Sequence, residues 1–354
     1  MSSSAPANPP APFAVPVIDI APFLAGGPDG RAAVAAAVDR AAREVGFMQI
    51  TGHGIPAEAV RELTDGLDAF FTLPMTEKRR WTAPVGVNRG YSPPKSERLS
   101  YSLGVASPSD LFEAFNIGRQ PSEFPELDLP QEHYEENVWP EGAEAFRTGA
   151  SAWFGHAGRL ARRMTEIFAV ALGLPDDFFA AYTGHSVDVM RMNNYLLPEA
   201  ETHVEPDQMG MGAHTDYGIV TVLWADAVRG LQVLAPDGVW HDVVPAPGAL
   251  LVNLGDLLAR WTNDRWISTM HRVLPPVDAT GRLIHRRSAA FFHDGDYDAL
   301  ISCLPGCENP DGTTLYAPVT IGEHLAAKLG GSRGLTLNRA AEREAARLTA
   351  ASGA

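Results

Sequence analysis

Short apolar runs separated by turns fill the second half of the chain, from Asp188 onward. Several short strands at regular spacing, with Gly and Pro between them, indicate an antiparallel sandwich or barrel. This pattern constrains the fold more than any other feature of the sequence, and it predicts a mainly β core. The runs are "VMRMNNYL", "GIVTVLWAD", "GLQVLA", "VWHDVVP", "ALLVNLGD", "HRVLPP" and "RSAAFFHD".

Strands and helices alternate in the first part of the chain. "VPVIDI" and "GFMQITGHG" are typical of strands, whereas residues 30–45 place small apolar side chains at helical spacing. A second helix begins after Pro56, and residues 141–172 predict a long amphipathic helix. Residues 84–140 are loop-like but contain scattered aromatics, which favour an ordered cover over disorder.

These signals predict one integrated globular unit with flanking helices around a β core. Residues 1–14, rich in Ser, Ala and Pro, are expected to be a disordered lead-in. Residues 15–185 form a helical N-terminal region with the cover loop, and residues 186–325 form the core. Residues 326–354 form a C-terminal helical tail, which includes the predicted surface helix "AAEREAARLTA".

Charge and cysteine content narrow the range of partners. The 354 residues carry a formal net charge of -15, which repels nucleic acids and anionic membranes. No apolar stretch approaches the ~20 residues that a membrane helix needs. The two cysteines, in "CLPGC", form no disulfide framework. We therefore expect a cytoplasmic protein without a nucleic-acid or membrane partner, and we expect it to be a monomer.

The stretch "GAHTDYG" places His214 and Asp216 two residues apart. Residues i and i+2 of a strand point to the same face, so the two side chains are suited to bind one divalent metal. An ordinary polar strand would have the same pattern. His271, in "STMHRVLPP", is the candidate third ligand, and together the three would leave open positions on iron. The other histidines considered are read as structural: His203, His241, His285 and His293.

A second pair follows in "HRRSAAFF". Arg286 and Ser288 are again i and i+2, and a guanidinium beside a hydroxyl is suited to bind a carboxylate. Asn193 and Tyr195, in "RMNNYL", show the same spacing and can join that site. Arg287 is interpreted as a surface ion-pair residue. A register shift by one residue would instead turn Arg287 inward.

These motifs, in this order, resemble those of the iron- and 2-oxoglutarate-dependent oxygenases of the isopenicillin N synthase-like family. The resemblance extends from about Val15 to Leu325 and includes "REVGFMQITGHGIP" and "RGYSPP". It implies a distorted double-stranded β-helix, or jelly roll, with Fe(II) held by His214, Asp216 and His271. It also implies that 2-oxoglutarate chelates the iron and reaches Arg286 and Ser288, with O2 as the second cosubstrate.

The resemblance also bears on the reaction. Related halogenases replace the metal-binding carboxylate by a small residue, so Asp216 favours hydroxylation of a metabolite, with succinate and CO2 as co-products. The segment between His271 and Arg286 is longer than is usual in the family, and we expect a longer hairpin to absorb it. The candidates for substrate contact are Tyr91, Tyr101, Phe115 and Arg191.

Three other functions fit parts of the pattern. An oxidase of the same fold that does not use 2-oxoglutarate also keeps an Arg-x-Ser pair. A ligand-binding barrel without catalytic activity would need no metal, and a zinc hydrolase uses similar ligands. Consumption of 2-oxoglutarate distinguishes the first of these, and stoichiometric metal binding the second.

Overall fold

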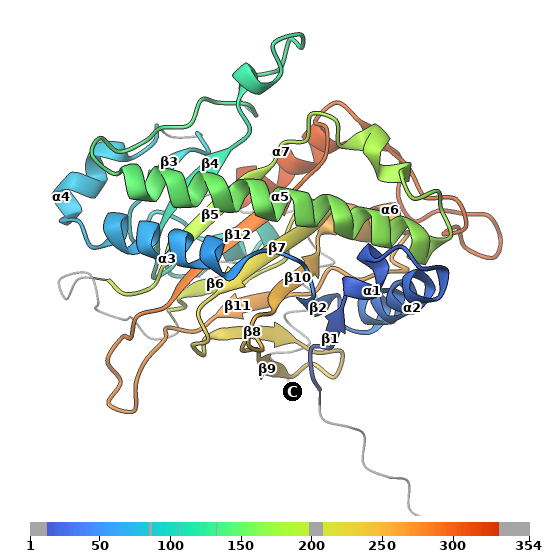
Figure 1. The fold of residues 1–354 in the computed structure, drawn as a ribbon, viewed down its shortest axis with the longest axis horizontal. Helices are drawn as coiled ribbons and strands as arrows, with labels where there is room; N and C mark the ends of the chain where they lie inside the picture. Colours follow the sequence, from blue (N-terminus) through green and yellow to red (C-terminus); the bar gives the residue numbers. More distant parts are fainter. Residues whose placement is uncertain (1–12, 85–86, 106, 132, 198–207, 333–354) are drawn as a thin grey trace, which may run out of the picture.

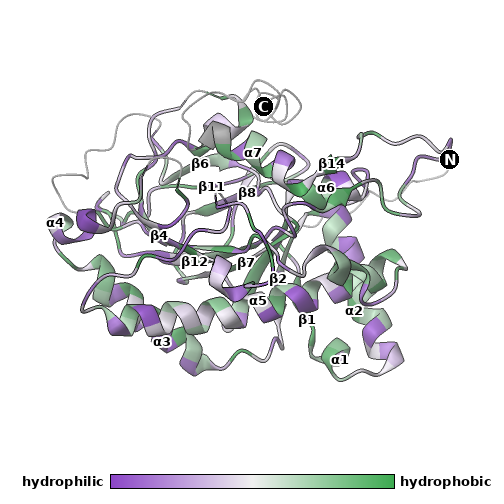
Figure 2. Cartoon of the chain, turned by 90° about the horizontal axis from the view of Figure 1, so that it is seen from above, coloured by the Kyte–Doolittle hydropathy of each residue, from purple (hydrophilic) through white to green (hydrophobic). Residues whose placement is uncertain are grey.

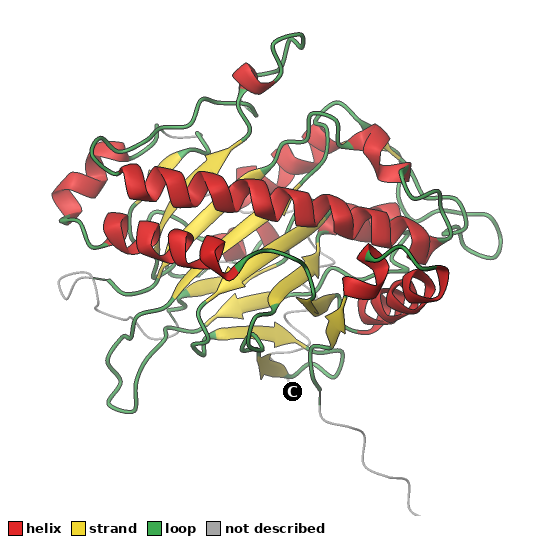
Figure 3. Cartoon of the chain, viewed as in Figure 1, coloured by secondary structure: helices red, strands yellow, loops and turns green. Residues whose placement is uncertain are grey.

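The computed structural model describes residues 13–84, 87–105, 107–131, 133–197 and 208–332. Two sheets face each other, and helices cover the outer face of the larger one (Figures 1 and 3). The mainly β core with flanking helices is therefore confirmed. No helix in these described ranges combines the length and apolar character needed to cross a bilayer.

The larger sheet has eight strands in the order β1-β2-β10-β7-β12-β5-β4-β3. All neighbouring pairs in it are antiparallel except β1 and β2. It combines four strands from the first part of the chain with four from the second, so both parts form one sheet. The strands are β1 (Val17–Asp19), β2 (Phe47–Thr51), β3 (Gly90–Ser92), β4 (Glu113–Gly118), β5 (Val189–Asn194), β7 (Val220–Ala225), β10 (Leu250–Leu254) and β12 (Arg287–His293).

The smaller sheet has four strands in the order β6-β11-β8-β9. These are β6 (Met211–His214), β8 (Leu231–Leu234), β9 (Trp240–Asp242) and β11 (His271–Val273). A two-stranded ribbon of β13 (Leu300–Ile301) and β14 (Val319–Thr320) follows. Facing antiparallel sheets of this kind are the sandwich that the strand pattern predicts, and they form the jelly roll that the family resemblance implies.

Three helices pack on the larger sheet, and the longest, α5 (Glu144–Leu172), runs across it (Figure 1). α5 contacts α2 (Pro28–Glu44), α3 (Ala57–Phe71) and the strands β7 and β12. Hydrophobic and hydrophilic residues alternate along these helices (Figure 2), as their amphipathic spacing predicts. The shorter helices are α1 (Ala21–Leu24), α4 (Met75–Lys78), α6 (Asp256–Trp261) and α7 (Ile321–Ser332).

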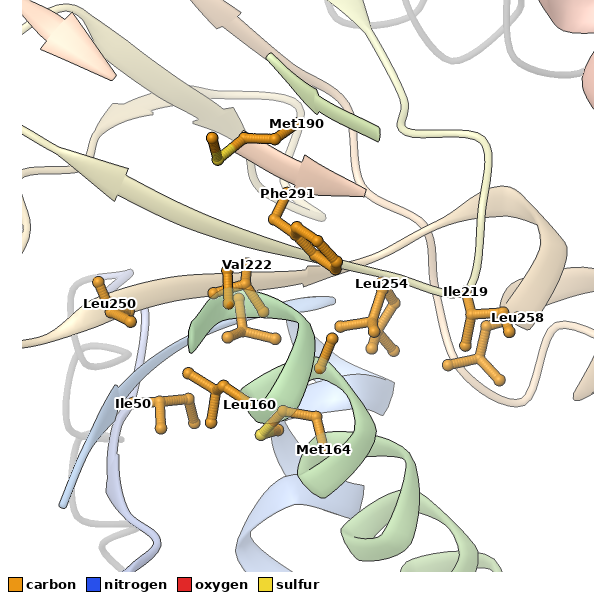
Figure 4. Packing of buried hydrophobic residues seen from close by; sticks show 14 of the residues in the cluster. Ile50, Leu160, Met164, Met190, Ile219, Val222, Leu250, Leu254, Leu258 and Phe291 are labelled. Atoms are coloured by element: carbon orange, nitrogen blue, oxygen red, sulfur yellow. The ribbon is translucent and has the colours of Figure 1, made fainter. Parts of the chain in front are cut away.

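The period-2 alternation of the strands separates a packed face from a polar face. Phe291 and Met190 pair across β12 and β5 and belong to the same core cluster as Leu160 and Met164 of α5 (Figure 4). Their neighbours along the chain point the opposite way, toward the smaller sheet. The larger sheet therefore has its apolar core on one side, and on the other side it lines a cavity between the sheets.

The structure corrects two parts of the predicted organisation. Residues 84–140 are more than a cover loop, because they contain β3 and β4, which extend the larger sheet at one edge. α7 begins at Ile321, ahead of the predicted boundary at residue 326, because Ile321 and Leu325 are buried in the main core. Residues 1–12, most of the predicted lead-in, and residues 333–354, with the predicted surface helix, lie outside the described residues.

Candidate active site

A cavity opens between the two sheets, and both sheets contribute its walls. β6 and β11 supply His214 and His271 on one side. The larger sheet supplies Asn193, Ser288 and Phe292 from the strands β5 and β12, on the face opposite the core. The residues that the sequence singles out as polar and inward therefore reach one shared space.

The three candidate metal ligands converge in this cavity. His214 and His271 are direct partners in the antiparallel pairing of β6 and β11. Their Nε2 atoms lie 3.8 and 3.7 Å from Oδ1 of Asp216. One ligand atom from each residue lies within 4.8 Å of the others, and all three residues are buried. Two imidazoles and one carboxylate at this spacing suit a single divalent iron ion with open positions.

Hydrogen bonds orient each ligand. Nδ1 of His214 lies 2.8 Å from the carbonyl oxygen of Gly212, and Nδ1 of His271 lies 3.2 Å from that of Thr269. A proton on each Nδ1 leaves Nε2 free to bind metal. Burial, with the neighbouring His271, lowers the pKa of His214 to about 3, so its imidazole is neutral at physiological pH. His214 is thus held in the protonation state that metal binding requires.

Asp216 lies beyond the end of β6, which differs from the predicted strand pair. The carboxylate is positioned by neighbours from the other sheet instead. Its Oδ2 accepts a hydrogen bond from Thr221 Oγ1 at 2.5 Å and another from Asn253 Nδ2 at 2.7 Å. These two bonds occupy Oδ2 and turn Oδ1 toward the imidazoles. The shared face therefore results from contacts across the cavity and not from strand geometry alone.

A buried guanidinium lies deeper in the same cavity. Arg286 is 2 % exposed, and its Nε and Nη1 have no hydrogen-bond partner among the described residues. Its guanidinium carbon lies 4.8 Å from the ring centroid of Tyr195. Asn193 Nδ2 donates to Ser288 Oγ at 3.2 Å beside it. A buried cation without a counter-ion favours binding of an anionic ligand, because burial of an unpaired charge costs free energy.

The structure also decides between the two possible registers at Arg286. Arg287 points outward, where Nε lies 3.0 Å from Asp226 and Nη1 lies 2.8 Å from Asp68. The long segment ahead of it folds back on itself through a bridge between Val277 and Leu283. The additional residues lie in this turn and leave the register of β12 unchanged.

Two of the aromatic candidates for substrate contact do not reach the cavity. Tyr91 and Phe115 are paired on β3 and β4 and point into the main core, against Phe70. The Tyr91 hydroxyl donates to the buried carboxylate of Glu113. Since side chains alternate along a strand, Asn116 faces the cavity where Phe115 cannot. This packing corrects their interpretation as substrate contacts.

Of the other two candidates for substrate contact, Arg191 lines the cavity and Tyr101 does not. Tyr101 accepts a hydrogen bond from Arg98 at 2.7 Å and is not part of the cavity wall. Arg191 does line the cavity, but it is already engaged, with Nη2 2.9 Å from Glu97 and Nε donating to Asn193 at 3.1 Å. The segment predicted to cover the site contributes other residues to the wall, namely Asn88, Arg89, Glu97, Leu99, Asn116 and His133.

The histidines interpreted as structural lie apart from the ligands where they are described. His241 stacks near Phe13, His285 lies 3.6 Å from Asp68, and His293 lies 2.8 Å from the buried Asp188. His203 lies outside the described residues. Sequence reasoning missed Thr221, Asn253 and Asp294 as cavity residues. The sequence does indicate a special role for Asn253, because this polar residue interrupts the apolar run "ALLVNLGD".

Comparisons with known proteins agree with this geometry. Residues 15–142 match the family model described as the non-haem dioxygenase in morphine synthesis N-terminal region, and residues 187–295 match that of the 2OG-Fe(II) oxygenase superfamily. A 2-oxoglutarate-Fe(II) type oxidoreductase of Emericella nidulans, hxnY, is 36 % identical over 320 residues, which cover 88 % of each chain. Homoarginine-6-hydroxylase of Glycine max is 30 % identical, covering 89 % of this chain and 96 % of its own.

Solved structures that resemble this chain also include 2-oxoglutarate-binding proteins and 2OG-Fe(II) oxygenase family members. A Neurospora crassa protein, crystallised in complex with alpha-KG and thymine, superposes with a TM-score of 0.77 at 27 % identity. The match covers 89 % of this chain and 96 % of that one. A 2OG-Fe(II) oxygenase family protein from Caulobacter crescentus superposes with a TM-score of 0.76 at 27 % identity, covering 89 % of this chain and 98 % of its own.

Proposed function

Because this chain belongs to the 2-oxoglutarate–Fe(II) oxygenase superfamily, we propose that it hydroxylates a small molecule at the His214–Asp216–His271 cluster. It is a non-haem Fe(II)- and 2-oxoglutarate-dependent dioxygenase. In the proposed reaction, one oxygen atom of O2 enters the substrate and the other enters succinate, while 2-oxoglutarate loses CO2. Hydroxylation is supported by the homoarginine-6-hydroxylase relatives, whose chains this one matches over nearly their whole length.

We propose that the three ligands hold Fe(II) through Nε2 of His214, Nε2 of His271 and Oδ1 of Asp216. The bound metal would supply the O2 chemistry that oxidises both 2-oxoglutarate and the substrate. The protein contributes the preorganised ligand set: Thr221 and Asn253 hold the carboxylate, and Phe47 packs edge-on against His271 with ring centroids 5.2 Å apart. This support keeps the ligands in place when the metal is absent.

Arg286 is the proposed receptor for the distal carboxylate of 2-oxoglutarate. Its unpaired Nε and Nη1 are the donors, and the hydroxyl of Ser288 lies on the same wall. The Tyr195 ring under the guanidinium fixes its plane, and Asn193 orients Ser288. The single observation that carries the proposed function is this buried, unpaired cation in the cavity that also contains the triad.

We propose that the partner is a small molecule, since the interior cavity would hold both cosubstrate and substrate. We further propose that the protein acts as a monomer in the cytoplasm. Both cysteines are free thiols, which suits a reducing compartment, and the net charge of -15 disfavours nucleic acid as a ligand.

Succinate formation tests the proposal. The protein is incubated with Fe(II), ascorbate, O2 and 2-oxoglutarate, with and without candidate substrates, and succinate is quantified. We expect slow uncoupled succinate formation that a substrate accelerates and that Arg286→Ala suppresses. O2 consumption with 2-oxoglutarate left intact would favour the oxidase that does not use 2-oxoglutarate. Absence of stoichiometric metal binding would favour the non-catalytic binding barrel.

A further inference from the structure

The cavity contains one carboxylate that has neither a metal-binding role nor a partner. Asp294 follows β12 directly and lines the cavity beyond Phe292, at the end away from Arg286. Its side chain makes no hydrogen bond or ion pair with any described residue. Burial, together with the carboxylates of Asp188 and Asp216, raises the pKa of Asp294 well above its ordinary value. A carboxyl group that lines the cavity without a partner is suited to accept charge-assisted hydrogen bonds from a cationic ligand.

The surrounding backbone leaves room for this carboxylate. Gly218 lies two residues after the metal ligand Asp216, and an added Cβ there would collide with Oδ1 of Asp294. His293, beside it, pairs in register with Val220 of β7. Asp294 is therefore fixed next to the loop that carries Asp216, on the same cavity as the reacting centre.

A second unpaired acceptor lies on the cavity wall. Asn116 is 1 % exposed, and its Oδ1 has no hydrogen-bond partner among the described residues. It faces the cavity from β4, opposite Arg191 in the register of β4 and β5. A buried amide oxygen without a donor costs free energy, which a ligand N–H would recover.

The two arginines of the wall other than Arg286 already have partners. Arg191 is paired with Glu97. The guanidinium of Arg89 donates to three backbone carbonyls, those of Asn88, Arg119 and Glu135, at 2.8, 2.8 and 3.2 Å. Among the described wall residues, the carboxyl group of Asp294 and the amide oxygen of Asn116 are therefore acceptors left for a substrate.

We propose that Asp294 binds a cationic nitrogen of the substrate, an ammonium or guanidinium group, and that Asn116 accepts a hydrogen bond from another N–H of the substrate. Both are substrate-binding residues. This inference rests on the proposed function, because it assigns the substrate class of the same cavity. The apolar side chains of Val187, Val189 and Phe292, between the two acceptors, suit the carbon skeleton that would carry the oxidised C–H bond.

Binding of a matched pair of probes tests this inference. Hexylguanidinium and hexylurea have the same shape, but only the first carries charge. Each is titrated calorimetrically, without O2, into the protein loaded with Fe(II) and 2-oxoglutarate. We expect hexylguanidinium to bind roughly tenfold more tightly or better, because its hydrogen bonds to Asp294 are charge-assisted. Equal affinities for the two probes would overturn the inference.

Three variants test whether Asp294 causes the preference for hexylguanidinium over hexylurea. Asp294→Asn should bind the two probes with similar affinity, and Asp294→Glu should keep the preference for the cation. Asp298→Asn is the matched control, because Asp298 is 58 % exposed and pairs with His185 outside the cavity. It should bind like the parent protein. A cation preference that persists in Asp294→Asn, with a normal melting curve, would show that Asp294 does not hold the cation.

The inference and the proposed function fail in different ways. Succinate formation without cation preference would leave the dioxygenase reaction intact and reject the substrate class. Cation preference that depends on Asp294, without any 2-oxoglutarate consumption, would support the binding site and reject the proposed reaction.

Discussion

The two ends of the cavity differ in what they leave unpaired. At one end, Arg286 presents buried donors without an acceptor. At the other, Asp294 presents an acceptor without a donor among the described residues, and Asn116 presents a second one on the wall between the two ends. The three candidate iron ligands line the same cavity. This asymmetry indicates that two ligands of opposite polarity share the cavity, an acid at the Arg286 end and a base at the Asp294 end.

The largest expected effect comes from the ligand that joins the two sheets. Asp216→Ala removes the carboxylate and also leaves the donors of Thr221 and Asn253 without an acceptor. We expect iron binding and substrate-dependent succinate formation to fall to background, because two imidazoles alone hold Fe(II) weakly. Iron content after desalting and succinate yield are the measurements. Iron bound at one equivalent per chain in this variant would rule out the assigned site.

The next effect separates two adjacent arginines. Arg286→Ala should raise the KM for 2-oxoglutarate by about 100-fold, since loss of a buried charged partner costs about 2–5 kcal/mol. Arg287→Ala is the control: it removes the pairs with Asp226 and Asp68 and should lower the melting temperature while leaving that KM nearly unchanged. Steady-state kinetics and thermal melts separate the two outcomes. If Arg287→Ala raised this KM and Arg286→Ala did not, the register of β12 would be shifted by one residue.

A smaller effect is expected from the residue that orients Asp216. Asn253→Ala should weaken Fe(II) affinity by about 10- to 100-fold while the protein stays folded, because partners of metal ligands typically contribute that much. Anaerobic Fe(II) titration measures it. Asn309→Ala, in an exposed turn, is the matched control and should bind iron normally. Unchanged affinity in Asn253→Ala would mean that the hydrogen bond to Asp216 does not position the ligand.

The smallest effect is on stability and has a defined pH dependence. The raised pKa of Asp294 means that the folded chain is destabilised as pH rises from the ordinary aspartate pKa toward the folded-state pKa. Asp294→Asn should therefore raise the melting temperature at neutral pH by about 1–3 °C. The gain should disappear below the ordinary aspartate pKa of 3.8, where both side chains are neutral. A lower melting temperature for the variant at pH 7 would indicate an ionic partner for Asp294.

The same two ends differ in how far the sequence predicts them. His214, His271 and Ser288 lie on β6, β11 and β12, where period-2 alternation decides the direction of each side chain, and Asp216 and Arg286 stand beside the ends of β6 and β12 in the same compact motifs. The helices α2, α3 and α5 are long enough for their spacing to predict them within a few residues. The outward direction of Arg287 follows from the same alternation, since Ser288 needs the inward face.

The substrate end depends on contacts that no local pattern contains. The sequence does not predict β4, because "EAFNIG" contains a buried Glu113, whose charge is balanced by Lys78 at 2.8 Å, from a helix 35 residues away. Without that strand, the inward direction of Asn116 and the core position of Phe115 cannot be derived. Asp294 follows an apolar run as any turn residue does, and only the paired register of β7 and β12 places it beside the loop of Asp216.

Anomalous scattering at the iron edge tests the central claim most directly. Crystals grown anaerobically with Fe(II) and 2-oxoglutarate should show a single strong peak per chain, bonded to His214, Asp216 and His271. Density for 2-oxoglutarate should extend from that peak to the guanidinium of Arg286. A peak at another site, or 2-oxoglutarate bound away from Arg286, would contradict the account.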